Sequence, residues 1–249
     1  MQPELFIKLN LLPSLNLLYL LIAMIYFNNV CKVYPPENVC LDCINLTVSA
    51  GEFVSVVGHS GAGKTTLVKM LLAEEKPSSG NVYFQSVDIH SLNSGDLTKF
   101  RRQIGTVFQD FKLLPNKTAY ENLAFAMEAV GKTDEEIIGD VPHVLELVNL
   151  SNKIHHFPHQ MSGGEKQRLA IGRAIINQPK VVVADEPTGN LDPISAHDIV
   201  QILKRINDLG TTVILTTHNK GIVESIGKRV VTIDKGRIVR DDKDGKYVI

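Results

Sequence analysis

The fold of this chain is decided by one stretch, Gly58-His59-Ser60-Gly61-Ala62-Gly63-Lys64-Thr65. It matches the pattern G-x-x-x-x-G-K-[ST], which requires a strand before it and a helix after it. The β-branched run 53–57 predicts a buried strand, and residues 64–73 predict a helix. Such a loop binds phosphates through its backbone N–H groups and the helix N-terminus. We expect Lys64 to reach the β- and γ-phosphates and Thr65 to ligate Mg²⁺.

A second motif lies where the buried run 181–184 ends in Asp185-Glu186. In a parallel sheet, ligands bind at the carboxyl ends of the strands. Asp185 is predicted to hold Mg²⁺, directly or through water, and Glu186 to polarise the attacking water as general base. Many strands end in an acid, but beside a phosphate loop this pair indicates nucleotide hydrolysis.

Composition narrows the class of protein further. The chain has 249 residues, 44% of them hydrophobic, which is enough to bury a large core. Lys and Arg number 26 against 27 Asp and Glu, so no basic field for nucleic acid or polybasic membrane patch is expected. Three cysteines are too few for a secreted disulfide scaffold, which favours a reducing cytoplasm.

The Cys40-x-x-Cys43 pair and the cluster of His155, His156 and His159 are weaker signals. A zinc site needs about four ligands, and no second Cys pair follows. We therefore predict incidental thiols at the cysteines, with a metal or redox role as the alternative, and a polar loop at the histidines, with a metal site as the alternative.

Residues 1–23 fit the rest of the chain poorly. Leu9–Phe27 carries no charge and has the length of a membrane helix, but Asn10, Pro13 and Asn16 interrupt it. The run Met24–Phe27 predicts the first core strand. We expect residues 1–23 to be a mis-assigned start before Met24 or a short hydrophobic extension, with an interfacial or spanning anchor as the alternative.

Residues 24–249 are predicted to form one domain in which strands alternate with helices, so the class is α/β with a parallel sheet. Residues 90–160 predict a helical subdomain, apart from a strand at 104–108. Capping boxes at Thr118 and Thr133 open two helices. Gly139 and Pro142 predict a break in the second helix, with a new piece opening at Asp140 or Val141.

The segment Met161–Arg168 identifies the family. Ser162 and Glu165 form a capping box, yet two glycines in the first helical turn weaken a helix, so we expect a phosphate to approach the backbone there. The segment resembles the signature motif of ABC ATPases, with Met161 where Leu is usual and Lys166 where Gln is usual. The resemblance covers about 24–240. It implies a P-loop NTPase of the ABC type, with a RecA-like core, a β-rich subdomain and a helical subdomain.

The resemblance also implies roles for single residues. Gln109 is similar to the glutamine that approaches Mg²⁺ and the water, Asp192 belongs to a D-loop-like segment, and His218 resembles the switch histidine of the γ-phosphate. Tyr34 lies where the family stacks an aromatic ring on adenine, although a turn or core tyrosine is the alternative. The implied catalytic residues are Glu186, His218 and Gln109. The implied metal ligands are Thr65, Gln109 and Asp185. The implied nucleotide contacts are Tyr34, Gly58, His59, Ser60, Gly61, Ala62, Gly63, Lys64, Thr65, Thr66, Ser162, Gly163, Gly164 and Asp192.

Each motif occurs once, which by the resemblance implies a head-to-tail homodimer with two ATP sites. The segment Asp185–Asp192 is similar to the branch serving lipoprotein release, macrolide export and cell division. The segments Phe108–Pro115 and Thr118–Leu123 are most similar to the cell-division FtsE family. That family implies an integral membrane partner of FtsX type, division-site proteins, a peripheral place on the cytoplasmic face of the plasma membrane, and control of peptidoglycan hydrolysis by ATP cycling.

Three alternatives remain at this point. The first is the ATPase subunit of a transporter for lipoprotein release or small-molecule efflux. The second is a soluble ABC protein acting on DNA or ribosomes, which the lack of a coiled-coil insertion or a second ATPase domain disfavours. The third is an ATP-gated scaffold that does not hydrolyse, because sequence does not report turnover.

Overall fold

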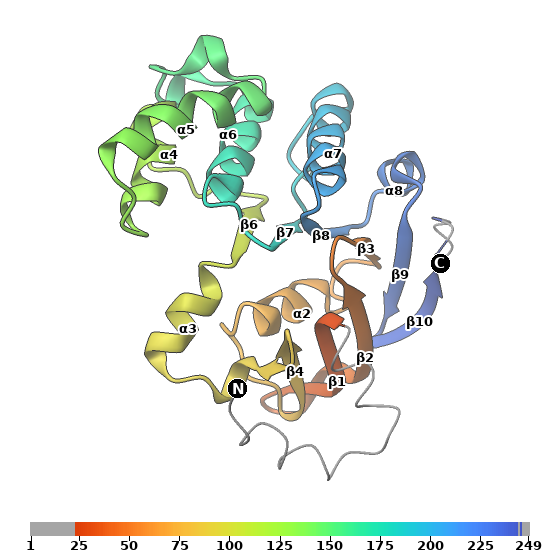
Figure 1. Cartoon of the computed structure of the whole chain (residues 1–249). Coiled ribbons are helices and arrows are strands. Elements are labelled where there is room, and N and C mark those ends of the chain that lie inside the picture. Colours follow the sequence, from red (N-terminus) through yellow and green to blue (C-terminus); the bar gives the residue numbers. More distant parts are fainter. Residues whose placement is uncertain (1–22, 244, 246–249) are drawn as a thin grey trace.

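The computed structural model describes residues 23–243 and 245, and two β-sheets organise them (Figure 1). An antiparallel sheet has the order β2-β1-β4-β5, with β1 (Ala23–Tyr34), β2 (Asn38–Ser49), β4 (Ser79–Phe84) and β5 (Val87–Asp88). A six-stranded sheet has the order β10-β9-β3-β8-β7-β6, with β3 (Phe53–Val57), β6 (Ile104–Phe108), β7 (Val181–Asp185), β8 (Thr212–Thr217), β9 (Arg229–Asp234) and β10 (Arg237–Asp242). All of its pairings are parallel except that of β10 with β9.

The described part of the chain contains the helices α2 (Lys64–Leu71), α3 (Ser94–Arg101), α4 (Ala119–Glu128), α5 (Asp134–Leu147), α6 (Gly163–Ile175), α7 (Pro193–Asp208) and α8 (Lys220–Ile226). Short 3₁₀ turns are η3 (Ile89–Ser91), η4 (Ser151–Lys153) and η5 (Pro158–Gln160). Helices α4, α5 and α6 pack on one another and form a lobe apart from the antiparallel sheet (Figure 1). Strand β6 belongs to the six-stranded sheet, which agrees with the strand that the sequence predicts over residues 104–108.

Two hydrophobic cores cover the two faces of the parallel sheet. Along β7, Val181 and Val183 belong to the core shared with α2 and the antiparallel sheet, whereas Val182 and Ala184 belong to the core shared with α4 to α8. Side chains of a strand alternate between faces, so a continuous Val-Val-Val-Ala run is buried on both. The parallel sheet is therefore held rigidly between two apolar layers.

The register of the parallel strands brings their carboxyl ends to one edge. Val57 at the end of β3 pairs with Thr217, Thr216 pairs with Asp185, and Asp185 pairs with Phe108. The residues that follow these strand ends therefore lie along the same edge. This is where a doubly wound sheet binds its ligand.

The predicted break in the second helix of the lobe is wrong, because α5 runs unbroken over Asp134–Leu147 with Pro142 inside it. Proline costs an interior helix roughly 3 kcal/mol, since it removes an N–H and crowds the preceding turn. Here Pro142 is exposed, while Ile137, Val141 and Leu145 are buried at helical spacing. Packing of that apolar face carries the helix through the proline. Both predicted capping boxes are present, at Thr118 and at Thr133.

Strand β1 begins at Ala23, so the prediction of a first strand over Met24–Phe27 is confirmed. The hypotheses on residues 1–22 lie outside the described residues. Among the helices that the structure describes, none combines the length and the apolar character needed to cross a membrane.

Candidate active site

The phosphate loop connects β3 to α2 and is shaped by its glycines. Gly63 has φ +109°, and a Cβ there would lie 2.8 Å from the Cys40 carbonyl oxygen and 2.5 Å from Leu41 Cδ2. Only glycine fits at this position, because strand β2 passes directly against the loop. The N-terminus of α2 consequently opens into the space that the loop encloses.

Lys64 begins α2, and its ammonium group is held inside the loop. Its Nζ donates hydrogen bonds to the carbonyl oxygens of Gly58 (2.8 Å) and His59 (3.2 Å), and lies 3.3 Å from Glu186 Oε1. The residue is only 6% exposed. A buried ammonium is stable only when paired, so Lys64 is a cation held ready for an anionic ligand.

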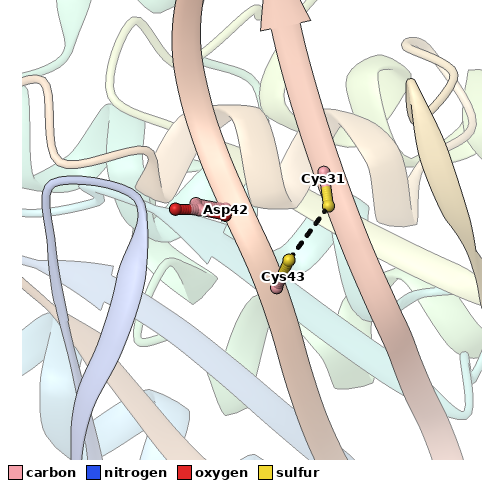
Figure 2. Close-up of side chains that lie close together, drawn as sticks. All are labelled: Cys31, Asp42 and Cys43. Carbon is pink, nitrogen blue, oxygen red and sulfur yellow. Dashed lines mark hydrogen bonds between the residues drawn. The ribbon is translucent and has the colours of Figure 1, made fainter.

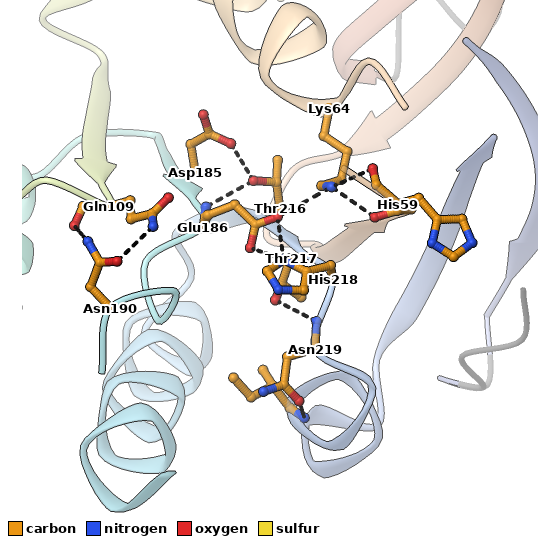
Figure 3. Close-up of polar contacts among 12 residues, drawn as sticks. His59, Lys64, Gln109, Asp185, Glu186, Asn190, Thr216, Thr217, His218 and Asn219 are labelled. Carbon is orange, nitrogen blue, oxygen red and sulfur yellow. Dashed lines mark hydrogen bonds and ion pairs between the residues drawn. The ribbon is translucent and has the colours of Figure 1, made fainter. Parts of the chain in front are cut away.

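The acidic pair at the end of β7 is positioned by β8. The Thr216 hydroxyl donates to Asp185 Oδ1 (2.5 Å) and accepts from the Glu186 N–H (3.0 Å). Glu186 has φ +47°, so its side chain leaves the strand direction and turns toward Lys64 and His218. The two Glu186 carboxylate oxygens lie 3.1 and 3.0 Å from His218 Nδ1 (Figure 3). Glu186 is thus placed between a fixed cation and an imidazole.

Gln109 follows β6 on the other side of the pair. Its Nε2 donates to Asn190 Oδ1 (2.9 Å), and Asn190 Nδ2 donates back to the Gln109 carbonyl (3.4 Å) (Figure 3). A Cβ at Gly189 would lie 2.9 Å from Gln109 Nε2, so the glycine leaves room for the amide in this position. The segments after β6 and β7 are coupled by this amide pair.

These residues line two neighbouring cavities. The first, about 530 Å³, is lined by Cys40, His59, Ser60, Gly61, Gly63, Lys64, Thr65, Thr66, Gln109, Glu186 and His218. The second, about 680 Å³, includes Thr65, Gln109, Asp185 and Glu186. Hydroxyl, amide and carboxylate oxygens converge there, the hard donors that Mg²⁺ prefers, so the residues present fit that cation.

Most of the predicted loop residues therefore meet around one cavity, and two are placed differently. Ala62 is buried with the core, and Gly58 contributes its carbonyl oxygen to Lys64. His59 also contributes its carbonyl, while its imidazole points away from the acidic pair (Figure 3).

Tyr34, Ser162, Gly163, Gly164 and Asp192 line neither cavity in the part of the chain that the structure describes. Tyr34 ends β1, and the Lys32 ammonium lies 4.9 Å from its ring centroid. The Asp192 carboxylate caps α7 by accepting from the Ile194 and Ser195 N–H groups and the Ser195 hydroxyl. These hydrogen bonds, the Ser195 hydroxyl first, lower the pKa of Asp192. The nucleotide contacts of all five residues stay predictions.

Ser162 caps α6 as predicted, accepting from the Glu165 N–H (3.2 Å) while its own N–H donates to Glu165 Oε2 (2.8 Å). That N–H bond is the main cause that lowers the pKa of Glu165. The sequence predicts that the glycines at 163 and 164 let a phosphate approach the backbone. At Gly164 there is a different reason for glycine, because a Cβ there would lie 2.8 Å from Ser195 Oγ. Gly164 lets α6 pack on the start of α7.

Sequence reasoning missed three residues that shape the site. Thr216 orients both acids, Asn190 holds Gln109, and the Cys40 thiol donates to Thr66 Oγ1 (3.1 Å) within the first cavity. Thr216 and Asn190 stand in strand and turn contexts where Thr and Asn are ordinary. Thr216 meets Asp185 through the register of β8 with β7, and Asn190 meets Gln109 between the segments that follow β7 and β6; neither relation can be read from the sequence.

Comparison with known proteins agrees with this geometry. Residues 41–189 match the ABC transporter family, and the chain belongs to this family of ATP-binding cassettes, whose members hydrolyse ATP. Within the family, it is similar to the cell division ATP-binding protein FtsE of Bacillus subtilis, with 49% identity over 224 residues that cover 90% of this chain and 98% of FtsE. It is also similar to the methionine import ATP-binding protein MetN of Coxiella burnetii, with 42% identity over 88% of this chain and 64% of MetN.

Among solved structures, the dimeric post-hydrolysis state of the ATP-binding cassette MJ0796 bound to ADP and Pi superposes with a TM-score of 0.80. It shares 34% identity and covers 90% of this chain and all of its own. The predicted ABC ATPase fold, the similarity to FtsE and the ATPase activity are thereby confirmed.

Proposed function

We propose that this chain is the ATP-hydrolysing subunit of an FtsEX-like membrane complex in cell division, where ATP cycling controls peptidoglycan hydrolysis through a membrane partner. The observation that carries the proposal is the 49% identity to FtsE, which extends over 98% of that protein. Because the identity extends over nearly all of FtsE, it includes the segments outside the nucleotide site. Members of this family differ in those segments according to the process that they drive.

The site supports a defined division of labour in hydrolysis. In the free chain, the Lys64 ammonium is satisfied by two carbonyl oxygens and Glu186. On binding, phosphate oxygens replace part of this set, and Glu186 becomes available to a water molecule. Glu186 then accepts the proton of the attacking water, and His218 stabilises the γ-phosphate and orients the carboxylate. Mg²⁺, held by Thr65 and Asp185 with Gln109 nearby, would neutralise phosphate charge.

A homodimer completes the proposed site. Ser162 and Gly163 lie exposed at the N-terminus of α6, where backbone N–H groups and the helix dipole favour an anion. In the part of the chain that the structure describes, neither residue lines a phosphate cavity of its own subunit. In a head-to-tail dimer, this helix end of one subunit contacts the γ-phosphate held by the other. ATP then closes the dimer and hydrolysis opens it.

The partner's docking place is proposed at a groove of about 590 Å³ beside the helical lobe. Its lining includes Arg101 and Arg102, both exposed, and the half-exposed ring of Phe125. A cytoplasmic segment with apolar and acidic side chains suits this surface. Arg173 lines the groove as well and donates to the carbonyls of Lys112 (2.6 Å) and Phe111 (3.1 Å), in the segment that follows Gln109. Movement in the groove is thus connected to the nucleotide site.

The proposal is tested by depleting the chain from its native cells. We expect cells that fail to separate and release fewer soluble peptidoglycan fragments, and restoration by the wild-type chain but not by the Glu186→Gln variant. Normal separation and fragment release in depleted cells would overturn the division role.

The second candidate is the ATPase subunit of a transporter, which the similarity to MetN favours. In that case, depletion would leave division intact and reduce the uptake or export of a labelled small molecule. The chemistry of the nucleotide site is the same for both candidates.

A further inference from the structure

Outside the nucleotide site, two thiols face each other across the antiparallel sheet. Val30 pairs with Ile44, so the next residues, Cys31 on β1 and Cys43 on β2, oppose one another where a bulge interrupts the ladder. Their sulfur atoms lie 3.4 Å apart, at hydrogen-bond distance (Figure 2). Cys43 is exposed and Cys31 partly so, which lets a small oxidant reach both.

We propose that Cys31 and Cys43 form a reversible disulfide, a modification site whose oxidation lowers the affinity of the neighbouring cavity for ATP. A disulfide requires a sulfur separation of about 2.05 Å and opposed Cβ atoms, and cross-strand neighbours meet the second condition already. The sulfur atoms have to approach by about 1.4 Å.

The connection to the cavity runs along β2. The Asp42 N–H donates to the Gly236 carbonyl (2.8 Å), and the Gly236 N–H donates to the Ala62 carbonyl in the phosphate loop (3.2 Å). Cys40, three residues from Cys43, lines the cavity and donates to Thr66. Drawing Cys43 toward Cys31 therefore displaces the stretch of β2 that supports the loop.

The chemistry needs an oxidant of the peroxide class. The Cys31 thiolate attacks one peroxide oxygen, the O–O bond breaks, and the leaving hydroxide takes up the proton that the Cys31 thiol had released, so a sulfenic acid and water result. The Cys43 thiol then attacks the Cys31 sulfur, so that the S–S bond forms and the S–O bond breaks. The hydroxide leaves with the Cys43 proton as a second water, and two thiols have lost two electrons to one peroxide. A hydrogen bond with Ser79 is the main cause that lowers the pKa of Cys31, while the hydrogen bond with Cys31 raises that of Cys43 to about 11. Cys31 is accordingly the attacking thiolate.

A metal site is the competing use of these groups. Asp42 offers a carboxylate oxygen within 4.8 Å of both sulfur atoms. However, the Asp42 carboxylate is already paired with a guanidinium, because its Oδ2 accepts from Arg237 Nε (2.7 Å). The geometry favours a dithiol pair over a three-ligand cation site.

The test treats the reduced full-length chain with stoichiometric hydrogen peroxide and follows its intact mass, its non-reducing peptide map and its Kd for ATP. The wild type and Cys40→Ser should each lose about 2 Da through a Cys31–Cys43 link that dithiothreitol reverses, whereas Cys31→Ser and Cys43→Ser should form no such link. Oxidation should weaken ATP binding of the wild type at least threefold and leave the Kd of Cys31→Ser unchanged.

Each contrary outcome is distinguishable. Over-oxidation of single thiols without a link, or a link through Cys40, would overturn the disulfide. A Cys31–Cys43 link that leaves the Kd for ATP unchanged would overturn its coupling to the cavity. Stoichiometric Zn²⁺ binding that requires both thiols and blocks the link would replace the proposal with a metal site.

Discussion

Replacing Glu186 by glutamine tests the proposed chemistry most sharply, because it removes the base and keeps its shape. The Glu186 side chain is 16% exposed and lies between Lys64 and His218. An amide accepts no proton at neutral pH, and a positioned general base contributes a factor of about 10²–10⁴, equivalent to about 3–5 kcal/mol of barrier. We therefore expect kcat to fall at least a hundredfold. Since Lys64 keeps two carbonyl acceptors, the free energy of unfolding should change by about 1 kcal/mol or less.

The assay is phosphate release at saturating ATP, together with the mass of the complex in solution. Glu186→Gln should bind ATP and accumulate as an ATP-bound dimer, because closure is no longer followed by hydrolysis. Glu224→Gln on the surface of α8, which also loses a carboxylate near a lysine, should keep wild-type turnover. Turnover of Glu186→Gln within threefold of the wild type would refute the role of Glu186 as base.

Three further changes have expected results. Lys64→Ala removes a charge-assisted donor worth about 1.5–3 kcal/mol, so the Kd for ATP measured by calorimetry should rise roughly 10–150-fold; a change below twofold would contradict the phosphate contact. Gly63→Ala adds a Cβ that would lie 2.8 Å from the Cys40 carbonyl oxygen at φ +109°, whereas a Cβ at Gly61 would have no atom within 4 Å. Gly63→Ala should therefore lower the Tm of the ATP-free chain by several degrees more than Gly61→Ala does. Equal Tm shifts for the two variants would contradict the steric argument. Asn122→Ala deletes a fully buried amide that accepts from the Leu114 N–H and donates to three carbonyl oxygens. The free energy of unfolding should fall by about 2–3 kcal/mol and the Tm by roughly 4–12 °C. An unchanged Tm would show that water replaces the amide.

The parts of the fold that local chemistry determines were predictable. Three signals determine local structure within a few residues of the chain. They are the glycines with positive φ in the phosphate loop, a β-branched run buried on both faces, and Thr or Ser three residues before Glu at a helix start. The strand 53–57, the strand 104–108 and the capping boxes at Thr118, Thr133 and Ser162 are confirmed for that reason.

The parts that depend on tertiary packing were not predictable in the same way. Pro142 remains inside α5 because the buried face of the helix outweighs the missing hydrogen bond. Gly164 is explained by Ser195, a residue 31 positions away, and Thr216 acts on Asp185 through strand register. The opposition of Cys31 and Cys43 likewise required the pairing of β1 with β2, which spacing along the chain does not give.

The most direct test of the division role is affinity purification of the tagged chain from gently solubilised native membranes, with mass spectrometry of the proteins that accompany it. We expect a membrane protein of FtsX type and division-site proteins in stoichiometric amounts, and their loss when Phe125→Asp places a charge in the docking groove. A transporter permease in place of that partner, retained by the wild-type chain, would contradict the division role and leave a transport ATPase with the same nucleotide chemistry.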